Sequence, residues 1–276
     1  MPYITVGKEN SGDIDLYYED HGVGAPVVLI HGYPLDGRSW EKQEAALLDA
    51  GFRVIAYDRR GFGRSSQPSV GYDYDTFAAD LDVLLSRLDL QDVTLAGFSM
   101  GTGEVTRYLG TYGSGRVNKA VLLAPVPPFL LKTADNSEGL DHSLFEGFMA
   151  AATADRPAFM TGFLEAFYNY DVYGGNLVSE ERFRASWNTA TSASATAAVA
   201  CIDTWLTDFR GDLPKLDVPV LVLQGDQDRI LPPVFTGNRL PGLIDDMSHI
   251  VIEGGPHAII WTHANQVNAA LLDFLK

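Results

Sequence analysis

A serine between two glycines stands where a buried strand gives way to a helix. Residues 97–101 read Gly-Phe-Ser-Met-Gly, after the apolar run 93–98 and before a helical stretch that extends to about residue 112. The G-x-S-x-G motif requires this context, because a sharp strand-to-helix turn lifts the serine hydroxyl above the sheet. The glycines let the chain bend, and the helix N-terminus directs free N–H groups to the same place. We therefore interpret Ser99 as a nucleophile, with a structural turn serine as the alternative.

A serine hydroxyl is a weak nucleophile near neutral pH and needs a base that an acid orients. In the chain order Ser…Asp…His, the acid follows a late strand. Two candidates, Asp226 and Asp228, follow the apolar run 219–224. We favour Asp228 as the acid because it lies further into the loop, and we expect Asp226 to cap or brace the turn. A metal site is the alternative for this pair, but no His or Cys partner stands nearby at ligand spacing.

Six histidines are candidates for the base. His257 follows the last expected strand, 249–253, which places it at the same sheet edge as Ser99 and Asp228. His249 opens that strand and is expected at the opposite edge. His31, which follows the strand 26–30, is the rival, but we expect it to hydrogen-bond its own loop. The remaining histidines are expected in turns or at the start of the last helix: His21, His142 and His263.

The loop of residues 31–34, His-Gly-Tyr-Pro, leaves the third expected strand at the same edge. Backbone N–H groups there can form an oxyanion hole together with the N–H of the residue after the nucleophile. We assign these donors to Tyr33 and Met100, since Pro34 has no N–H and pushes Tyr33 toward an extended backbone. An ordinary strand-to-loop turn is the alternative.

These residues need a parallel sheet to bring them together. The sequence predicts short strands at 3–6 and 14–19 and continuous apolar strands at 26–30, 53–57, 93–98, 117–124, 219–224 and 249–253. Helices are expected over 39–50, 75–90 and 264–275, besides the one after Ser99. Continuous apolar runs suit strands that are buried on both faces, as parallel strands are. The fold class is therefore α/β, with helices flanking a mostly parallel sheet.

Residues 126–212 interrupt this rhythm and are expected to be helical. The predicted helices are Leu144–Ala152, Pro157–Tyr170, Glu180–Ala190 and Ala195–Leu206. We therefore divide the chain into an α/β core, 1–125 and 213–276, and a helical cap insertion, 126–212. An apolar pocket under this cap is predicted, and the alternative is that its aromatic residues only pack helices together. The predicted lining residues are Tyr33, Phe98, Phe129, Phe163 and Trp205.

Composition limits the classes of partner. The chain has 276 residues, 46% of them hydrophobic, and a net charge of −16, so we expect a globular protein with a real core. Nucleic acids and anionic membranes bind proteins through clustered Lys and Arg side chains. Because this chain is strongly acidic, we expect neither as a partner. No segment resembles a signal peptide or a membrane span, and the one cysteine, Cys201, permits no internal disulfide. We therefore predict a cytoplasmic protein.

Over essentially its full length the chain resembles the α/β-hydrolase superfamily, and more closely the cofactor-free (non-haem) haloperoxidases with their esterase and γ-lactamase relatives. The strings that carry the resemblance are 14–20, 28–35, 57–63, 71–81, 97–104 and 261–264. The resemblance implies a Ser99, Asp228 and His257 triad, oxyanion N–H groups at Tyr33 and Met100, a helical cap and homo-oligomers. The chain departs most from the family in the second half of the cap and at 237–248.

The expected activity is hydrolysis of small carboxylic esters, and also of amides or γ-lactams, through an acyl-serine and without metal or cofactor. A side reaction is expected in which hydrogen peroxide replaces water and the released peracid oxidises halide. Pro34 favours it, because its fixed φ aims the Tyr33 carbonyl, a potential acceptor for peroxide. Dehalogenases and epoxide hydrolases of this fold use Asp where this chain has Ser99. A non-catalytic ligand-binding protein on the same fold is the alternative.

Overall fold

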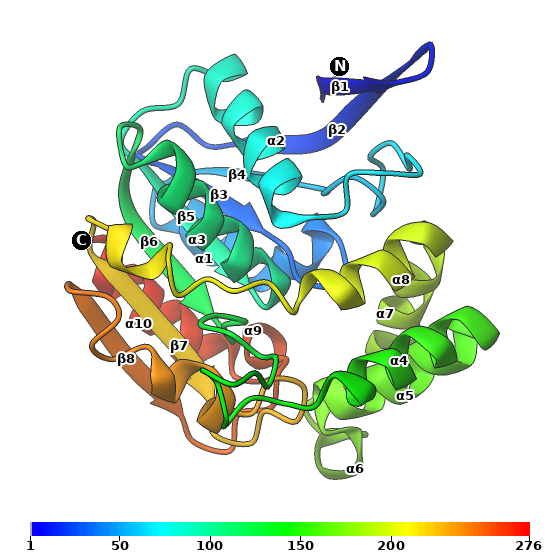
Figure 1. Ribbon diagram of the computed structural model, residues 1–276. Helices are drawn as coiled ribbons and strands as arrows, with labels where there is room; N and C mark the ends of the chain where they lie inside the picture. Colours follow the sequence, from blue (N-terminus) through cyan, green and yellow to red (C-terminus); the bar gives the residue numbers. More distant parts are fainter. Residues whose placement is uncertain (1) are drawn as a thin grey trace.

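The computed structural model describes residues 2–276, which form one eight-stranded sheet with helices on its faces (Figure 1). The strand order is β1-β2-β4-β3-β5-β6-β7-β8. The strands β3 to β8 run parallel to one another, whereas β2 pairs antiparallel with both β1 and β4. The bounds are β1 Tyr3–Glu9, β2 Gly12–His21, β3 Pro26–Ile30, β4 Arg53–Tyr57, β5 Val93–Phe98, β6 Val117–Leu123, β7 Val220–Gly225 and β8 Met247–Ile252. The expected α/β fold class, a mostly parallel sheet flanked by helices, is confirmed.

The central strands are buried on both faces. Every residue of β5 and β7 is buried, and in β3 and β4 only the first residue is partly exposed. Both faces therefore need apolar residues, which explains why these strands read as continuous apolar runs. Because β3, β5 and β7 point the same way, the loops that leave their carboxyl ends meet at one edge of the sheet.

Two pairs of helices flank the sheet. Helix α2 (Tyr74–Arg87) packs against α3 (Met100–Tyr112), and α1 (Glu41–Asp49), preceded by the short 3-10 turn η1 (Gly37–Trp40), packs against α10 (Ala264–Leu275). The helix expected over 75–90 ends earlier, because Leu88 closes it and Asp89 takes a left-handed backbone with φ of 46°.

Five helices lie between β6 and β7 in the sequence, gathered to one side of the sheet (Figure 1). They are α4 His142–Ala154, α5 Arg156–Tyr168, α6 Tyr170–Tyr173, α7 Glu180–Ser192 and α8 Ala195–Thr204. The expected helix 157–170 stops at Tyr168 because Asn169 is left-handed, with φ of 47°, and α6 begins after it.

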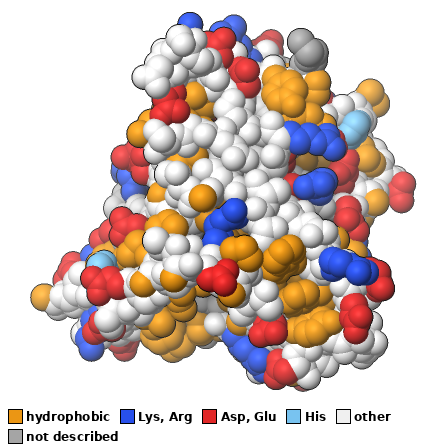
Figure 2. Space-filling view, turned by 90° about the vertical axis from the view of Figure 1, so that its right-hand side faces the viewer, with side chains coloured by type: hydrophobic (Ala, Val, Ile, Leu, Met, Phe, Trp, Pro, Cys, Tyr) orange, Lys and Arg blue, Asp and Glu red, His pale blue; other side chains and the backbone are white. Residues whose placement is uncertain are grey.

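On the face shown in Figure 2, acidic and basic side chains are interspersed and apolar side chains gather in the lower part.

Several short elements lie in the last part of the core. The 3-10 turns η2 (Leu213–Lys215), η3 (Pro233–Phe235) and η4 (Gly237–Arg239) and helix α9 (Ile259–Thr262) connect the longer elements. The position expected for His249 was wrong: β8 begins at Met247, and His249 lies inside the strand opposite Val222. Within residues 2–276, no helix combines the length and apolar character needed to cross a bilayer.

Candidate active site

Ser99 occupies a sharp turn between β5 and α3. Its backbone has φ of 54° and ψ of −120°, which a residue with a side chain adopts only under strain. The turn is held on both sides, since the Ser99 N–H donates to the Leu123 carbonyl at 2.8 Å and the Thr102 N–H donates to the Ser99 carbonyl at 2.9 Å. The surrounding sheet and helix thus fix the serine in a conformation that presents its hydroxyl above the strand ends.

The glycines of this turn are required by close packing. A Cβ at Gly97 would lie 2.4 Å from the Gly101 carbonyl oxygen, and a Cβ at Gly101 would lie 2.3 Å from the Ile30 carbonyl oxygen. A Cβ at Gly32 would lie 2.8 Å from the Cβ of Ser99. The loop after β3 therefore packs directly on the serine turn, which brings residues 31–34 beside Ser99.

Three side chains from separate loops form a continuous hydrogen-bonded chain. His257 Nε2 lies 2.8 Å from Ser99 Oγ, and His257 Nδ1 lies 2.7 Å from Asp228 Oδ2. The other carboxylate oxygen of Asp228 accepts from the N–H groups of Ile230 and Leu231, at 2.9 and 2.8 Å. All three side chains are buried, Ser99 being 5% exposed. The arrangement fixes the carboxylate, which in turn orients the imidazole toward the serine.

The imidazole of His257 packs against two aromatic rings. The ring of Phe98 lies 5.2 Å from it and that of Phe167 lies 5.1 Å from it, between centroids. The carbonyl of Phe167, near the end of α5, also accepts from the Ala258 N–H at 3.0 Å. Phe98 therefore packs against the histidine and does not line the cavity, so its assignment to the pocket was wrong.

Asp226 has the bracing position expected for it. One of its carboxylate oxygens accepts from the Gly254 N–H at 2.8 Å, which links the ends of β7 and β8. Its side chain is exposed, whereas that of Asp228 is buried against His257.

Two backbone N–H groups stand free beside the serine. Within residues 2–276, neither the N–H of Tyr33 nor that of Met100 donates a hydrogen bond to a protein acceptor. Met100 is the first residue of α3, so its N–H also carries the positive end of the helix dipole. The peptide bond between Tyr33 and Pro34 is cis, and the Leu35 N–H donates to the Gly32 carbonyl at 3.1 Å to close the turn.

His31 makes hydrogen bonds to its own surroundings. Its Nδ1 lies 2.9 Å from the Gly32 carbonyl oxygen, and its Nε2 accepts from the Arg59 N–H at 2.9 Å. Burial, together with the nearby Arg59 guanidinium, holds the pKa of His31 well below its ordinary value. The imidazole is therefore neutral, and its Nε2 is used as an acceptor for Arg59.

A buried ion pair lies beneath this loop, and the sequence reasoning missed it. Arg59 Nε donates to Glu104 at 2.7 Å, and Arg59 Nη2 donates to the His31 carbonyl at 2.9 Å. Tyr57 donates to the second oxygen of Glu104. Glu104 lies in the first turns of α3, so the pair links the helix that starts at Met100 to the loop of Tyr33. The available signal was the charged stretch 58–60 directly after a buried strand.

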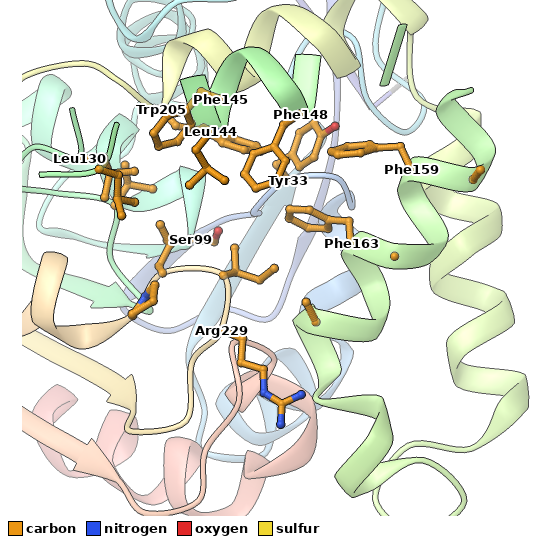
Figure 3. A pocket seen from close by; sticks show the side chains of 18 residues that line it. Tyr33, Ser99, Leu130, Leu144, Phe145, Phe148, Phe159, Phe163, Trp205 and Arg229 are labelled. Atoms are coloured by element: carbon orange, nitrogen blue, oxygen red, sulfur yellow. The ribbon is translucent and has the colours of Figure 1, made fainter. Parts of the chain in front are cut away.

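Ser99 opens onto an apolar cavity of about 490 Å³ (Figure 3). Three predicted lining residues, Tyr33, Phe163 and Trp205, do line it. Phe129 does not, because its ring packs under the Arg210 guanidinium at 4.9 Å instead. The remaining lining residues come from the loop 126–140, from α4 and α5, and from the loop after β7: Val126, Leu130, Leu140, Leu144, Phe145, Phe148, Ala158, Phe159, Gly162, Ala166, Arg229, Ile230, Leu231 and Pro232.

Arg229 is the one charged residue among the lining residues described. Its guanidinium points away from Ser99 (Figure 3) and pairs at 2.7 Å with Asp171 of α6. The wall that faces the serine is therefore aliphatic and aromatic, so the cavity favours an uncharged apolar group.

Comparisons with known proteins bear on the family and the fold. The model of a family described as alpha/beta hydrolase fold matches residues 25–264. A Synechocystis sp. protein whose provisional name is non-heme chloroperoxidase is 63% identical, with 100% of both chains covered. A bifunctional esterase/perhydrolase of Acinetobacter calcoaceticus is 34% identical, also over 100% of both chains. The crystal structure of a bromoperoxidase from Bacillus anthracis superimposes with a TM-score of 0.95 at 48% identity, covering 99% of this chain and 98% of that one.

Proposed function

The chain belongs to the α/β-hydrolase family, among the non-heme haloperoxidases and esterases, and from this premise we propose that it is a serine hydrolase of small, apolar carboxylic esters. The observation that carries the proposal is the hydrogen-bonded chain Asp228–His257–Ser99, which opens onto an apolar cavity. A pure binding protein needs no base beside a serine, so the non-catalytic alternative leaves this chain of contacts unexplained.

The proposed reaction proceeds in two halves through an acyl-enzyme. Ser99 Oγ attacks the ester carbonyl while His257 Nε2 takes its proton, and Asp228 stabilises the imidazolium that forms. The N–H groups of Tyr33 and Met100 donate to the oxygen that becomes negative. The alcohol leaves with the proton from His257. Water then attacks the acyl carbonyl and gives a proton to His257. His257 passes this proton to Ser99 Oγ as the bond to the acyl group breaks, which releases the acid and restores the serine.

We propose that the helical insertion 126–212 acts as a cap and that the acyl group binds in the cavity beneath it. The cap helices α4 and α5 supply its far wall, with Phe148 and Phe159 among the lining rings. A neutral aromatic or medium-length aliphatic acyl group gains by leaving water there, about 25 cal/mol per Å² of apolar surface. A carboxylate on the acyl chain would lose its hydration without gaining a partner. Amides and γ-lactams with apolar substituents fit the same acyl-serine scheme.

A panel of p-nitrophenyl esters tests this function. We expect the kcat/KM for butyrate, hexanoate and benzoate esters to exceed that for the hemisuccinate ester by more than tenfold. A fluorophosphonate probe should label the wild type and leave Ser99→Ala unlabelled. Preference for the charged acyl group would contradict the apolar site, and labelling of Ser99→Ala would contradict the nucleophile.

The same acyl-serine allows a perhydrolase side reaction. When hydrogen peroxide replaces water in the second half, the product is a peracid, which oxidises halide in solution. The Tyr33 carbonyl, whose direction depends on Pro34, is the proposed acceptor for the incoming peroxide. The names of the relatives, chloroperoxidase and esterase/perhydrolase, favour this reaction. Bromination of monochlorodimedone in acetate buffer with peroxide and bromide should disappear in Ser99→Ala, and its persistence without a carboxylic acid would rule the scheme out.

A further inference from the structure

The side chain of Tyr33 is tied to the cap. Its hydroxyl donates to the carbonyl oxygen of Ala198 in α8 at 2.9 Å, in a buried contact between positions 165 residues apart. Tyr33 is also one of the two residues near the serine whose backbone N–H groups, within residues 2–276, donate to no protein acceptor. A side-chain contact of this residue therefore bears directly on where its backbone N–H points.

Helix α8 is hydrogen-bonded to the core at both ends, so the position of its Ala198 carbonyl is restrained. At its N-terminus, the Ser194 N–H donates to the Gly61 carbonyl at 2.8 Å. At its C-terminus, the Thr204 hydroxyl donates to the Tyr72 carbonyl. The first turn packs so closely that a Cβ at Gly61 would lie 2.6 Å from the Cβ of Ala197. The Ala198 carbonyl thus sits in a helix held to the core at both ends.

The ring of Tyr33 is restrained on some sides only. Trp205 contacts it edge-on at 4.9 Å, Phe163 at 5.4 Å and Phe62 at 6.2 Å, between centroids. The cavity also borders this ring, so the packing leaves it room to shift. A hydrogen bond at the far end of the ring removes that freedom, because it fixes the position of the hydroxyl oxygen as well as the ring plane.

We infer that the Tyr33 hydroxyl is a positioning group for the oxyanion hole: by bonding to Ala198 it holds the Tyr33 N–H toward the oxygen that becomes negative. This inference rests on the proposed function. The cap then has two roles: it covers the cavity, and its helix α8 restrains the Tyr33 side chain. Burial raises the pKa of the Tyr33 hydroxyl well above its ordinary value, so the group stays a donor over the pH range of an esterase assay.

Tyr33→Phe tests the inference because it removes the hydroxyl and keeps the ring. Removing a whole oxyanion donor costs about 10²–10³ in kcat, and loosening one should cost less, roughly 5–20-fold. We expect that loss in kcat for p-nitrophenyl butyrate, equal from pH 6 to 9, with KM changed less than twofold. The affinity for phenylboronic acid, whose Ser99 adduct places an anionic oxygen in the same site, should fall by a similar factor.

Tyr168→Phe is the matched control. Its hydroxyl is buried and bonds to Ser186 of α7 at 2.8 Å, inside the cap and away from the oxyanion loop. We expect this variant to lose stability comparably and to keep kcat. Unchanged kcat and boronate affinity in Tyr33→Phe, a rise in KM alone, or an equal kcat loss in Tyr168→Phe would each overturn the inference. Wild-type activity in Ser99→Ala would instead overturn the proposed function, which separates the two failures.

Discussion

At the scale of single residues, two neighbouring aspartates have different surroundings. Asp228 is buried against His257, whereas Asp226 is exposed and holds the Gly254 N–H. Asp228→Asn should lower kcat by about 10⁴, because an asparagine amide in this place stabilises the wrong imidazole tautomer. Asp226→Asn, the matched control, should keep kcat within a few-fold. The kcat of ester hydrolysis by the two purified variants tests this assignment. A large kcat loss in Asp226→Asn and none in Asp228→Asn would show that the acid is misassigned.

A second prediction concerns the glycine behind the serine. In Gly101→Ala, the new methyl would lie 2.3 Å from the Ile30 carbonyl oxygen, so β3 and the start of α3 must move apart. Overpacking of this kind costs about 1–3 kcal/mol. We expect urea unfolding to show that loss, together with a kcat decrease, because Met100 and Ser99 shift with the helix. Gly147→Ala in α4, where nothing lies within 4 Å of the added Cβ, should leave kcat unchanged and raise stability by about 0.5–1 kcal/mol, because alanine is the better helix former.

At the scale of elements, the Arg59–Glu104 pair joins the loop after β3 to α3. Both side chains are buried, with exposures of 1% and 0%. Glu104→Gln leaves the Arg59 charge buried without a counter-ion, which should cost about 3–5 kcal/mol of unfolding free energy. Arg59→Met combined with Glu104→Leu should recover much of that loss, because replacing both charges removes the desolvation penalty. Equal stability of Glu104→Gln and wild type in urea would contradict this account.

The elements were largely predictable from the sequence. The strands 26–30, 53–57 and 93–98 have the predicted bounds, because burial on both faces leaves an uninterrupted apolar run. The helix ends at 88–89 and 168–169 were missed, since they depend on single left-handed residues, Asp89 and Asn169. The sequence order Ser99, Asp228, His257 also anticipated which side chains meet, because parallel strands end at one edge.

Other features of the site were beyond sequence reasoning. The sequence predicted an apolar pocket under the cap, but which aromatic rings face the cavity depends on side-chain direction. Phe98 turns to His257 and Phe129 to Arg210, whereas Phe148 and Phe159 line the cavity. The contact between Tyr33 and Ala198 joins positions far apart in the chain, so no local sequence pattern predicts it. The catalytic roles and the division at residues 126 and 212 stay predictions.

At the scale of the whole molecule, one buried carboxyl should shape the pH dependence of folding. Burial, together with the nearby Asp36, raises the pKa of Asp58 to about 6. In the unfolded chain an Asp has a pKa of about 3.9. The protonated form therefore stabilises the folded state below about pH 4, and this stabilisation is lost as the pH rises through about 6.

Asp58→Asn isolates this contribution, because asparagine does not titrate. Relative to wild type, the variant should gain about 1–3 kcal/mol of unfolding free energy between pH 4.5 and pH 8. Urea unfolding of both proteins at the two pH values measures it. Asp36 is buried next to Asp58, so the same comparison in an Asp36→Asn background should show a smaller gain. A difference between wild type and Asp58→Asn that does not change with pH would contradict the raised pKa.

The central claim is that Ser99 carries the acyl group during turnover. Rapid acid quench of the protein with p-nitrophenyl butyrate, followed by intact mass measurement and peptide mapping, tests it directly. We predict up to one butyryl group per chain, on the peptide that contains Ser99, in the first turnover of wild type, and none in His257→Ala, which lacks the base for acylation. An acyl group on another residue, or undiminished ester hydrolysis by Ser99→Ala, would contradict the account.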